Sequence, residues 1–265
     1  MRIIKQLFDF YLRSSLHVGI AVGALAFLTA LSNDLCRHIT YPCCVMFGTI
    51  LGYNFLKYAS VLVKGKFFRL KYLGIIIICL LCSYGFYFFI IRLLNGVKLQ
   101  LLLGVWMVLI YPSLRKHGVL KMFWVSFVIA YLTAFVFLNA LPTPKEIVAL
   151  EFLKRFFFVC ALMIPFEIYD SQHDEKTLNT LPQKYGIATA KKWGWLFLLL
   201  FVVLDIVRFV FLDKVEILKL SIDIFIAALT GIAIVFSNVD RSRYYTAFWV
   251  EGIPVLWFVL LLFFG

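Results

Sequence analysis

The sequence predicts an all-α membrane protein, a polytopic bundle of about nine transmembrane helices. Its composition is the first indication, because 63% of the residues are hydrophobic, only 15% are charged, and the mean hydropathy is +0.96. Soluble domains are usually about half apolar and about one quarter charged. The pattern is the second indication. Runs such as GIIIICLLCSYGFYFFII, residues 74–91, are apolar on every side, whereas the strands of a membrane barrel alternate.

Nine stretches approach the length of about 20 residues that a helix needs to cross a bilayer. They cover residues 14–32, 42–63, 70–92, 97–112, 119–141, 147–168, 192–212, 217–237 and 247–264. The first is predicted to be an uncleaved span rather than a signal peptide, although a basic segment precedes it. Because the hydrophilic segments between spans are short, we expect residues 1–265 to form a single integral membrane domain.

The net charge of +12 would favour nucleic acid as the partner of a soluble protein. In a membrane protein the placement of Lys and Arg is more informative, because cytoplasmic loops carry an excess of both. Most of the 26 basic residues lie in the amino-terminal segment and in the loops after the even-numbered spans. We therefore expect a cytoplasmic amino terminus, a carboxyl terminus outside, the lipid bilayer as partner, and no nucleic acid.

Acidic residues gather between the sixth and seventh spans, in the string EIYDSQHDEKTLNTLPQKYG, residues 167–186. Glu167, Asp170 and Asp174 follow one another at intervals of three and four, which places them on one face of a helix. Their mutual repulsion needs a cation or full solvation, and Mg²⁺ prefers such oxygen ligands. His173 would be carried into any metal site. The alternative is a solvated loop whose acids balance nearby lysines.

This string resembles the second aspartate-rich region of the UbiA family of membrane prenyltransferases, in which Asp-x-x-Asp-x-x-x-Asp precedes Thr-Leu-Pro and a glycine. Here Glu167 replaces the first Asp. The other matching positions keep order and spacing; they are Asp170, Asp174, Thr180, Leu181, Pro182 and Gly186. The resemblance implies a bundle of nine spans and a magnesium site at Glu167, Asp170 and Asp174.

The string YPSLRK, residues 111–116, looks like a second element of the same family, a Tyr-Pro followed by a Lys-Arg pair. The resemblance implies that Arg115 and Lys116 hold the diphosphate of the isoprenoid donor, with Tyr111 as a further candidate. From the residues alone, the two cations are explained equally well as signals that orient the neighbouring helix.

The family's first aspartate motif, Asn-Asp-x-x-Asp-x-x-x-Asp, corresponds to GYNFLKYASVLVKG, residues 52–65. Asn54 can stand for the motif's Asn, but Phe55 and Tyr58 take the positions of two acids. Lys57 can replace a metal as a direct cation for phosphate. Asn54, Lys57 and Tyr58 are therefore candidate site residues, and the chain is predicted to be a divergent member.

The resemblance implies transfer of an isoprenyl group from an isoprenyl diphosphate to a lipophilic acceptor, for example an aromatic one, at the cytoplasmic face. Magnesium would be the cofactor. The loss of the first motif leaves an alternative open: a non-catalytic protein of the same fold that binds a prenyl lipid or scaffolds other membrane enzymes.

Ionisable residues inside the spans are further candidates, because burying a charge in a membrane is costly. Asp205 and Arg208 lie three residues apart, and we expect them to pair with each other. Asp223 lies in the eighth span. Glu251 is a candidate for the cytoplasmic side of the bundle, with a role in helix packing as the alternative. His17, alone in the first span, is expected to be structural.

Overall fold

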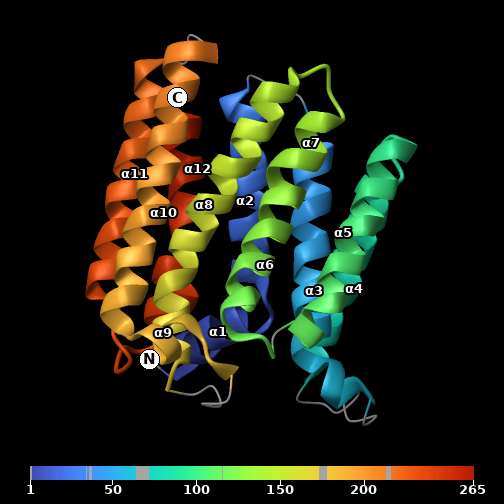
Figure 1. The fold of residues 1–265 in the computed structure, drawn as a ribbon. Coiled ribbons are helices and arrows are strands. Elements are labelled where there is room, and N and C mark those ends of the chain that lie inside the picture. The colour runs from blue at the N-terminus through green and yellow to red at the C-terminus, as the bar shows by residue number, and fades with distance from the viewer. Residues whose placement is uncertain are drawn as a thin grey trace.

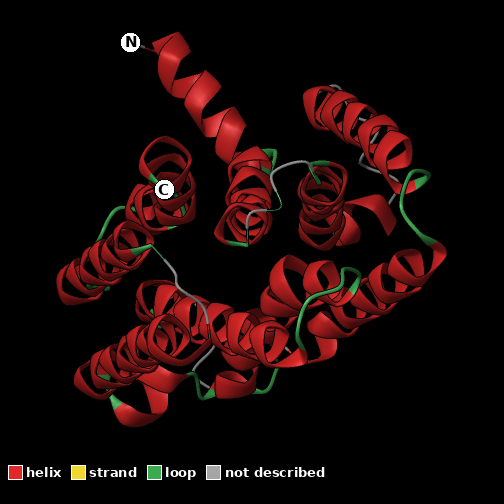
Figure 2. Ribbon diagram, turned by 90° about the horizontal axis from the view of Figure 1, so that it is seen from above, coloured by secondary structure: helices red, strands yellow, loops and turns green. Residues whose placement is uncertain are grey.

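A computed structural model describes residues 2–33, 35, 38–63, 72–114, 116–172, 178–212 and 216–265. Within these residues every regular element is a helix and no strand is present (Figure 2). The prediction of an all-α fold is confirmed.

Long helices run between the two ends of a bundle (Figure 1). In chain order they are α2 (Leu16–Ser32), α3 (Thr40–Val63), α4 (Leu73–Ile90), α5 (Asn95–Leu114), α6 (Gly118–Ala130) continued by the π-helical η2 (Tyr131–Phe135) and α7 (Val136–Asn139), α8 (Lys145–Asp170), α10 (Ile187–Val207) continued by η4 (Arg208–Leu212), α11 (Ile217–Phe236), and η5 (Tyr245–Val250) followed by α12 (Ile253–Phe264). Two short helices, α1 (Arg2–Arg13) and α9 (Leu181–Tyr185), lie at one end.

Six helical segments of the described chain are long and apolar enough to cross a membrane, or seven if α1 and α2, which are bent by 54°, form one broken span. The predicted windows 42–63 and 147–168 also lie on helices, α3 and α8, but neither is among these segments. Helix α8 carries several charged residues, including Glu151, Lys154 and Arg155. The membrane-spanning character is confirmed, and the number nine stays a prediction.

Helices α2 and α3 approach each other closely because α2 presents two glycines one turn apart. A Cβ atom at Gly23 would lie 2.8 Å from Cβ of Met46, and one at Gly19 would overlap the side chain of Ile50. Small residues at this spacing let helix backbones pack tightly, which replaces the hydrophobic driving force that is missing between helices in lipid.

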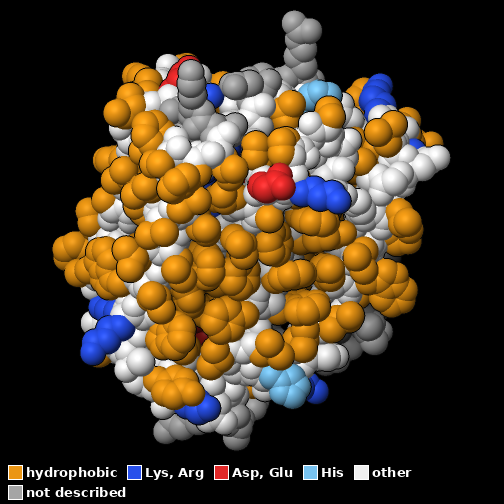
Figure 3. Space-filling model, turned by 45° about the horizontal axis from the view of Figure 1, so that its top comes forward, with side chains coloured by type: hydrophobic (Ala, Val, Ile, Leu, Met, Phe, Trp, Pro, Cys, Tyr) orange, Lys and Arg blue, Asp and Glu red, His pale blue; other side chains and the backbone are white. Residues whose placement is uncertain are grey.

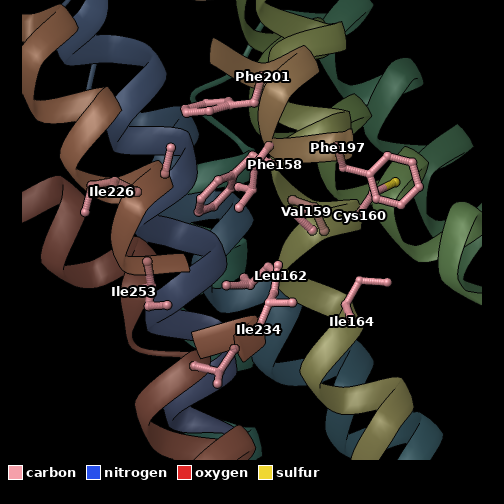
Figure 4. Close-up of a cluster of buried hydrophobic side chains, with 14 of the residues drawn as sticks. Phe158, Val159, Cys160, Leu162, Ile164, Phe197, Phe201, Ile226, Ile234 and Ile253 are labelled. Carbon is pink, nitrogen blue, oxygen red and sulfur yellow. The ribbon is translucent and has the colours of Figure 1, made fainter. Parts of the chain in front are cut away.

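The largest apolar core lies where α8 packs against α10, α11 and α12 (Figure 4). The ring centres of Phe158 and Trp257 lie 4.9 Å apart, and those of Phe201 and Trp257 lie 5.6 Å apart, both in edge-on geometry. Such arrangements are favourable for aromatic rings and add to the gain from burial. Helix α8 is therefore the element around which this half of the bundle is built.

Hydrophobic side chains cover most of the outer face seen in Figure 3, and charged side chains are few there. Large apolar residues such as Leu80, Trp106 and Phe211 keep more than half of their surface exposed. An apolar exterior of this extent indicates contact with lipid rather than water.

Both short helices lie at the same end of the bundle as the first residues, and the carboxyl terminus lies at the opposite end (Figure 1). We call the first of these the loop end; it holds α1, α9, the start of α6 and the carboxyl end of α8. The predicted opposite placement of the termini agrees with this arrangement. Their orientation relative to cytoplasm and exterior stays a prediction.

Candidate functional site

Two loops that are distant in sequence meet at the loop end. Gly118, the first residue of α6, has a φ of +36°, and a Cβ atom there would overlap the carbonyl oxygens of Leu178 and Asn179. Only glycine permits both this backbone conformation and this approach. The segment that follows YPSLRK therefore packs directly against residues 178 and 179, which precede α9.

A buried ion pair lies about one helical turn further into the bundle than this contact. The Nζ atom of Lys121, one turn into α6, is 3.1 Å from Oε1 of Glu167 on α8, and both side chains are almost fully buried. A buried pair is stabilising only if its geometry offsets the cost of removing both charges from water. Sequence reasoning missed Lys121. The available signal was a lysine in the first turns of an apolar span.

The Thr-Leu-Pro string begins helix α9. Thr180 is its N-cap and forms a capping box with Gln183, with Pro182 in the first turn. Gln183 also donates from Nε2 to the carbonyl oxygen of Ser171 at 3.2 Å. A capping box satisfies backbone donors at a helix start. The string thus ties α9 to the end of α8, where the half-buried Asp170 is the last helical residue.

The structure describes only some of the remaining candidate residues near the loop end. Lys116 is exposed, and Tyr111, near the end of α5, is half-buried. Arg115, His173 and Asp174 lie outside the described residues. The predicted roles of Lys116, Tyr111 and these three residues stay predictions.

The degenerate first motif lies on α3 and contacts the junction between α1 and α2. Asn54 is buried, donates from Nδ2 to the carbonyl oxygen of Ser14 at 2.7 Å, and accepts from the Ser15 hydroxyl at 3.2 Å. Lys57 Nζ and the Tyr58 hydroxyl both donate to the carbonyl oxygen of Arg13, at 3.0 and 3.1 Å. These side chains satisfy carbonyl groups that the end of α1 leaves without helical partners.

All three candidates on α3 thus hold α1 in place. The other side of α1 is attached as well, because Asp9 pairs with Arg243 and accepts a hydrogen bond of 2.8 Å from the Tyr244 hydroxyl. The predicted binding of diphosphate by Asn54, Lys57 and Tyr58 stays a prediction, and the structure supplies each of them with another partner.

Replacing Asn54 by alanine is expected to loosen α1, because two buried hydrogen bonds disappear and the Ser14 carbonyl loses its side-chain donor. The cost is about 1–3 kcal/mol. Amide hydrogen exchange should rise in residues 2–13 and stay unchanged in α8. Asn95→Ala, at an exposed asparagine, is the matched control; equal exchange in both variants would contradict the anchoring role.

The donor set for a magnesium ion is incomplete in the part of the chain that the structure describes. Glu167 faces Lys121, and no group of three or more His, Cys, Asp or Glu side chains converges among the described residues. Magnesium commonly uses one or two carboxylates and keeps several waters. Asp170 alone does not make such a site, so the described residues do not fit the ion by themselves.

A second polar feature, which the sequence suggested only in part, lies deeper in the bundle. We call it the charged network; it joins α8, α10, η4 and α11 through six buried side chains, Glu151, Lys154, Arg155, Asp205, Arg208 and Asp223. Lys154 Nζ lies 2.5 Å from Asp205 Oδ1 and 2.7 Å from Asp223 Oδ2. Arg208 pairs with Glu151. The three cations balance the three acids.

The expected pairing of Asp205 with Arg208 was wrong. Each residue pairs instead with a partner on α8, because α8 lies beside them and presents Lys154 and Glu151 at the right depth. Spacing within one helix cannot reveal a partner on another.

Arg155 has fewer partners than the rest of the network. Its Nη2 donates to the Thr29 hydroxyl at 3.1 Å, and its guanidinium carbon lies 5.0 Å from the centre of the Trp257 ring. Its Nε and Nη1 have no hydrogen-bond partner among the residues that the structure describes. Arg155 lies about 18 Å from Glu167 along α8, given a rise of about 1.5 Å per residue. The charged network is therefore separate from the loop end.

Comparison with known proteins adds one finding. No protein-family model matches the chain, and no curated protein matches it in sequence. A solved structure, described as the apo structure of a UbiA homolog from Aeropyrum pernix K1, superposes with a TM-score of 0.60 at 16% sequence identity. The match covers 92% of this chain and 97% of the other. The chain has the UbiA fold, as the motifs predicted.

Proposed function

We propose that the protein binds an isoprenyl diphosphate at the loop end and transfers the isoprenyl group to a lipophilic acceptor. The observation that carries the proposal is the contact of Gly118 with the carbonyl groups of Leu178 and Asn179. The same end of the bundle holds the ion pair between Lys121, in the first turns of α6, and Glu167, near the end of α8. The UbiA fold supports the same conclusion.

Isoprenyl transfer requires positive charge at the position from which diphosphate leaves. The bond between the allylic carbon and the diphosphate oxygen breaks, diphosphate keeps the electron pair, and a nucleophilic atom of the acceptor forms the new bond. Fixed cations favour this step because the leaving group gains negative charge. Lys121 is held in position by Glu167, which also offsets part of its charge, so it would contribute as a fixed ion pair next to the leaving diphosphate. Lys116 adds a second cation at the surface.

A test uses the purified protein in lipid nanodiscs with labelled isoprenyl diphosphates of several chain lengths and a membrane lipid extract, with magnesium or with EDTA. We expect a labelled lipid product. Asp170→Asn should lower its rate of formation by about 10²–10³-fold, the usual effect of removing one group that stabilises developing charge or positions such a group. Magnesium belongs to the proposal through the family resemblance, and loss of product in EDTA would support it.

Asp240→Asn is the matched control, because Asp240 is an exposed carboxylate in the turn before η5. Its product formation should equal that of the parent protein. Absence of product together with absence of diphosphate binding would overturn the proposal.

A second function is favoured by one observation. Asn54, Lys57 and Tyr58 are all engaged with the junction of α1 and α2, which is what a binding protein that has lost transfer chemistry would show. Diphosphate binding without any product in the same assay would support this non-catalytic alternative.

A further inference from the structure

Helix α1 leaves the bundle at the loop end in a direction that the fold fixes. Its axis is bent by 54° from that of α2, and it projects beyond the neighbouring helices (Figure 2). The backbone turns at Ser15, whose φ of 60° is uncommon for a residue other than glycine. Asn54 donates to the Ser14 carbonyl and accepts from the Ser15 hydroxyl. The bend is therefore held by α3.

The second half of α1 carries contacts with the bundle. The Phe8 ring packs edge-on against Phe248 of η5, with ring centres 4.9 Å apart. The Tyr11 hydroxyl donates to Nδ1 of His17 on α2 at 2.8 Å, and Nε2 of the same histidine donates to the Phe248 carbonyl at 3.0 Å. These contacts attach α1 to η5 and α2, and its first turns extend beyond them.

The exposed part of α1 is amphipathic. Ile3, Ile4 and Leu7 keep 72%, 73% and 65% of their surface exposed, and their spacing places them on one face of the helix. Lys5 and Arg13 lie on the other face and are exposed as well. A helix of this kind binds in the interfacial layer of a bilayer, with its apolar face toward the acyl chains.

A groove of about 400 Å³ lies at the boundary between these two faces. It is lined by Ile4, Lys5 and Phe8 of α1 and by Tyr244, the residue before η5. The Tyr244 hydroxyl donates to Asp9 at 2.8 Å, which holds its ring against α1. A lysine lays its apolar stem along such a wall and keeps its charged head in water. The groove thus combines an apolar wall with the Lys5 cation at its rim.

Positive charge predominates around the groove. In residues 3–13 and 238–244 the cations are Lys5, Arg13, Arg241 and Arg243, and the acids are Asp9 and Asp240. Asp9 is already paired with Arg243, whereas Lys5 pairs with no carboxylate of the described residues. A lysine ammonium binds phosphate as a point charge. Charge complementarity therefore favours an anionic occupant.

Exposed tryptophans place the groove near the membrane interface. Trp249, in η5, keeps 69% of its surface exposed, and Trp193, near the start of α10, keeps 39%. Tryptophan is enriched where acyl chains meet headgroups. An occupant that comes from the bilayer can therefore lay its chain against Ile4 and Phe8 while its headgroup stays beside Lys5.

We propose that the groove between α1 and Tyr244 binds an anionic phospholipid, with its phosphate at Lys5 and an acyl chain along Ile4 and Phe8. Phosphatidylcholine offers the same chains, but the cation of its headgroup offsets the charge of its phosphate. The inference is independent of isoprenyl transfer, because it concerns a lipid that is bound and not converted.

The test is native mass spectrometry of the purified protein in detergent, titrated with phosphatidylglycerol or with phosphatidylcholine of the same acyl chains. We expect Lys5→Gln to weaken binding of the first phosphatidylglycerol about fivefold, the contribution of one cation near anionic lipid. Phosphatidylcholine should bind the parent and the variant equally. Lys192→Gln, at an exposed lysine in the first turns of α10, is the matched control and should bind phosphatidylglycerol as the parent does.

A second variant separates the groove from a general attraction by surface charge. Ile4→Gln removes part of the apolar wall, leaves the charge unchanged and alters an exposed residue, so the fold should persist. It should also weaken phosphatidylglycerol binding. Unchanged affinity in either Lys5→Gln or Ile4→Gln would overturn the proposal.

Two further outcomes identify a different occupant. Displacement of the lipid by glycerol 3-phosphate would show that a free phosphate is sufficient, and it would contradict a role for the acyl chain. Dimers that form in place of lipid-bound monomers, and that Ile4→Gln abolishes, would show that a second copy of the chain covers the groove. Either result would overturn the assignment to a phospholipid.

Discussion

Replacing Lys154 by methionine is expected to lower the free energy of unfolding by about 3–5 kcal/mol, the usual cost of breaking a buried ion pair by removing one partner. The Lys154 ammonium lies between the carboxylates of Asp205 and Asp223, and all three residues are at least 95% buried. Methionine has a similar length but no charge. Two like charges would then remain in an apolar core with only Trp257 Nε1, 2.6 Å from Asp223 Oδ1, and more distant cations to offset them.

The measurement is equilibrium unfolding of the purified protein in mixed micelles. Lys192→Met is the matched control, because Lys192 is exposed on α10, and it should change the free energy by no more than about 0.5 kcal/mol. Combining Lys154→Met with Asp205→Asn and Asp223→Asn should recover part of the loss, since replacing a whole buried ionic group is often tolerated. Equal stability of Lys154→Met and Lys192→Met would show that the network does not hold these helices together.

Replacing Gly118 by alanine is expected to separate the two loops and abolish diphosphate binding. The added Cβ atom would overlap the backbone carbonyl oxygens of Leu178 and Asn179, which cannot turn away as a flexible side chain would. The φ of +36° adds backbone strain of about 1–3 kcal/mol for a residue other than glycine. Movement of residues 178–179 would separate the start of α6, next to Lys116, from the segment that precedes α9.

Gly186→Ala is the control for backbone strain without a clash. Gly186 also has a positive φ, +82°, but a Cβ atom there would have no neighbour within 4 Å. Both variants should unfold at lower temperature than the parent, whereas only Gly118→Ala should lose binding of a labelled isoprenyl diphosphate. Unchanged binding in Gly118→Ala would contradict the role of the loop contact.

Most of the helices could be predicted from the sequence because a lipid bilayer restricts the structures that a membrane-spanning segment can adopt. A spanning segment must satisfy its backbone groups internally, so long apolar stretches form helices, and each of the nine windows lies on a helix where the structure describes it. The predicted number of nine transmembrane spans is not tested by the presence of these helices. Helix α8 carries charges that the surrounding helices neutralise, which makes it less apolar than the other spans.

The surroundings of the candidate site could be predicted from the sequence in one half and not in the other. The spacing of Glu167 and Asp170 and the Thr-Leu-Pro string identified the loop end, and the structure explains that string as the start of α9. The string YPSLRK pointed to the same place. Lys121 was missed because a single lysine in an apolar run has no spacing pattern, and its partner lies 46 positions later on another helix.

The first motif shows the limit of an argument from residue types. Asn54, Lys57 and Tyr58 all have side chains that can bind phosphate oxygens. In the fold, however, they donate hydrogen bonds to the backbone carbonyl oxygens of Arg13 and Ser14. Which acceptor they reach depends on the 54° bend between α1 and α2, and no local pattern encodes that bend.

The sequence by itself determined the membrane class, the helical content and the resemblance to UbiA proteins, because hydropathy and motif spacing are properties of residues close together in the chain. Only the tertiary structure decided which charges are paired. The pairs of Lys154 with Asp205 and Asp223, of Lys121 with Glu167, and of Arg208 with Glu151 all join helices that are far apart in sequence. The physical reason is that the energy of a buried charge depends on distances across the bundle, which only helix packing sets.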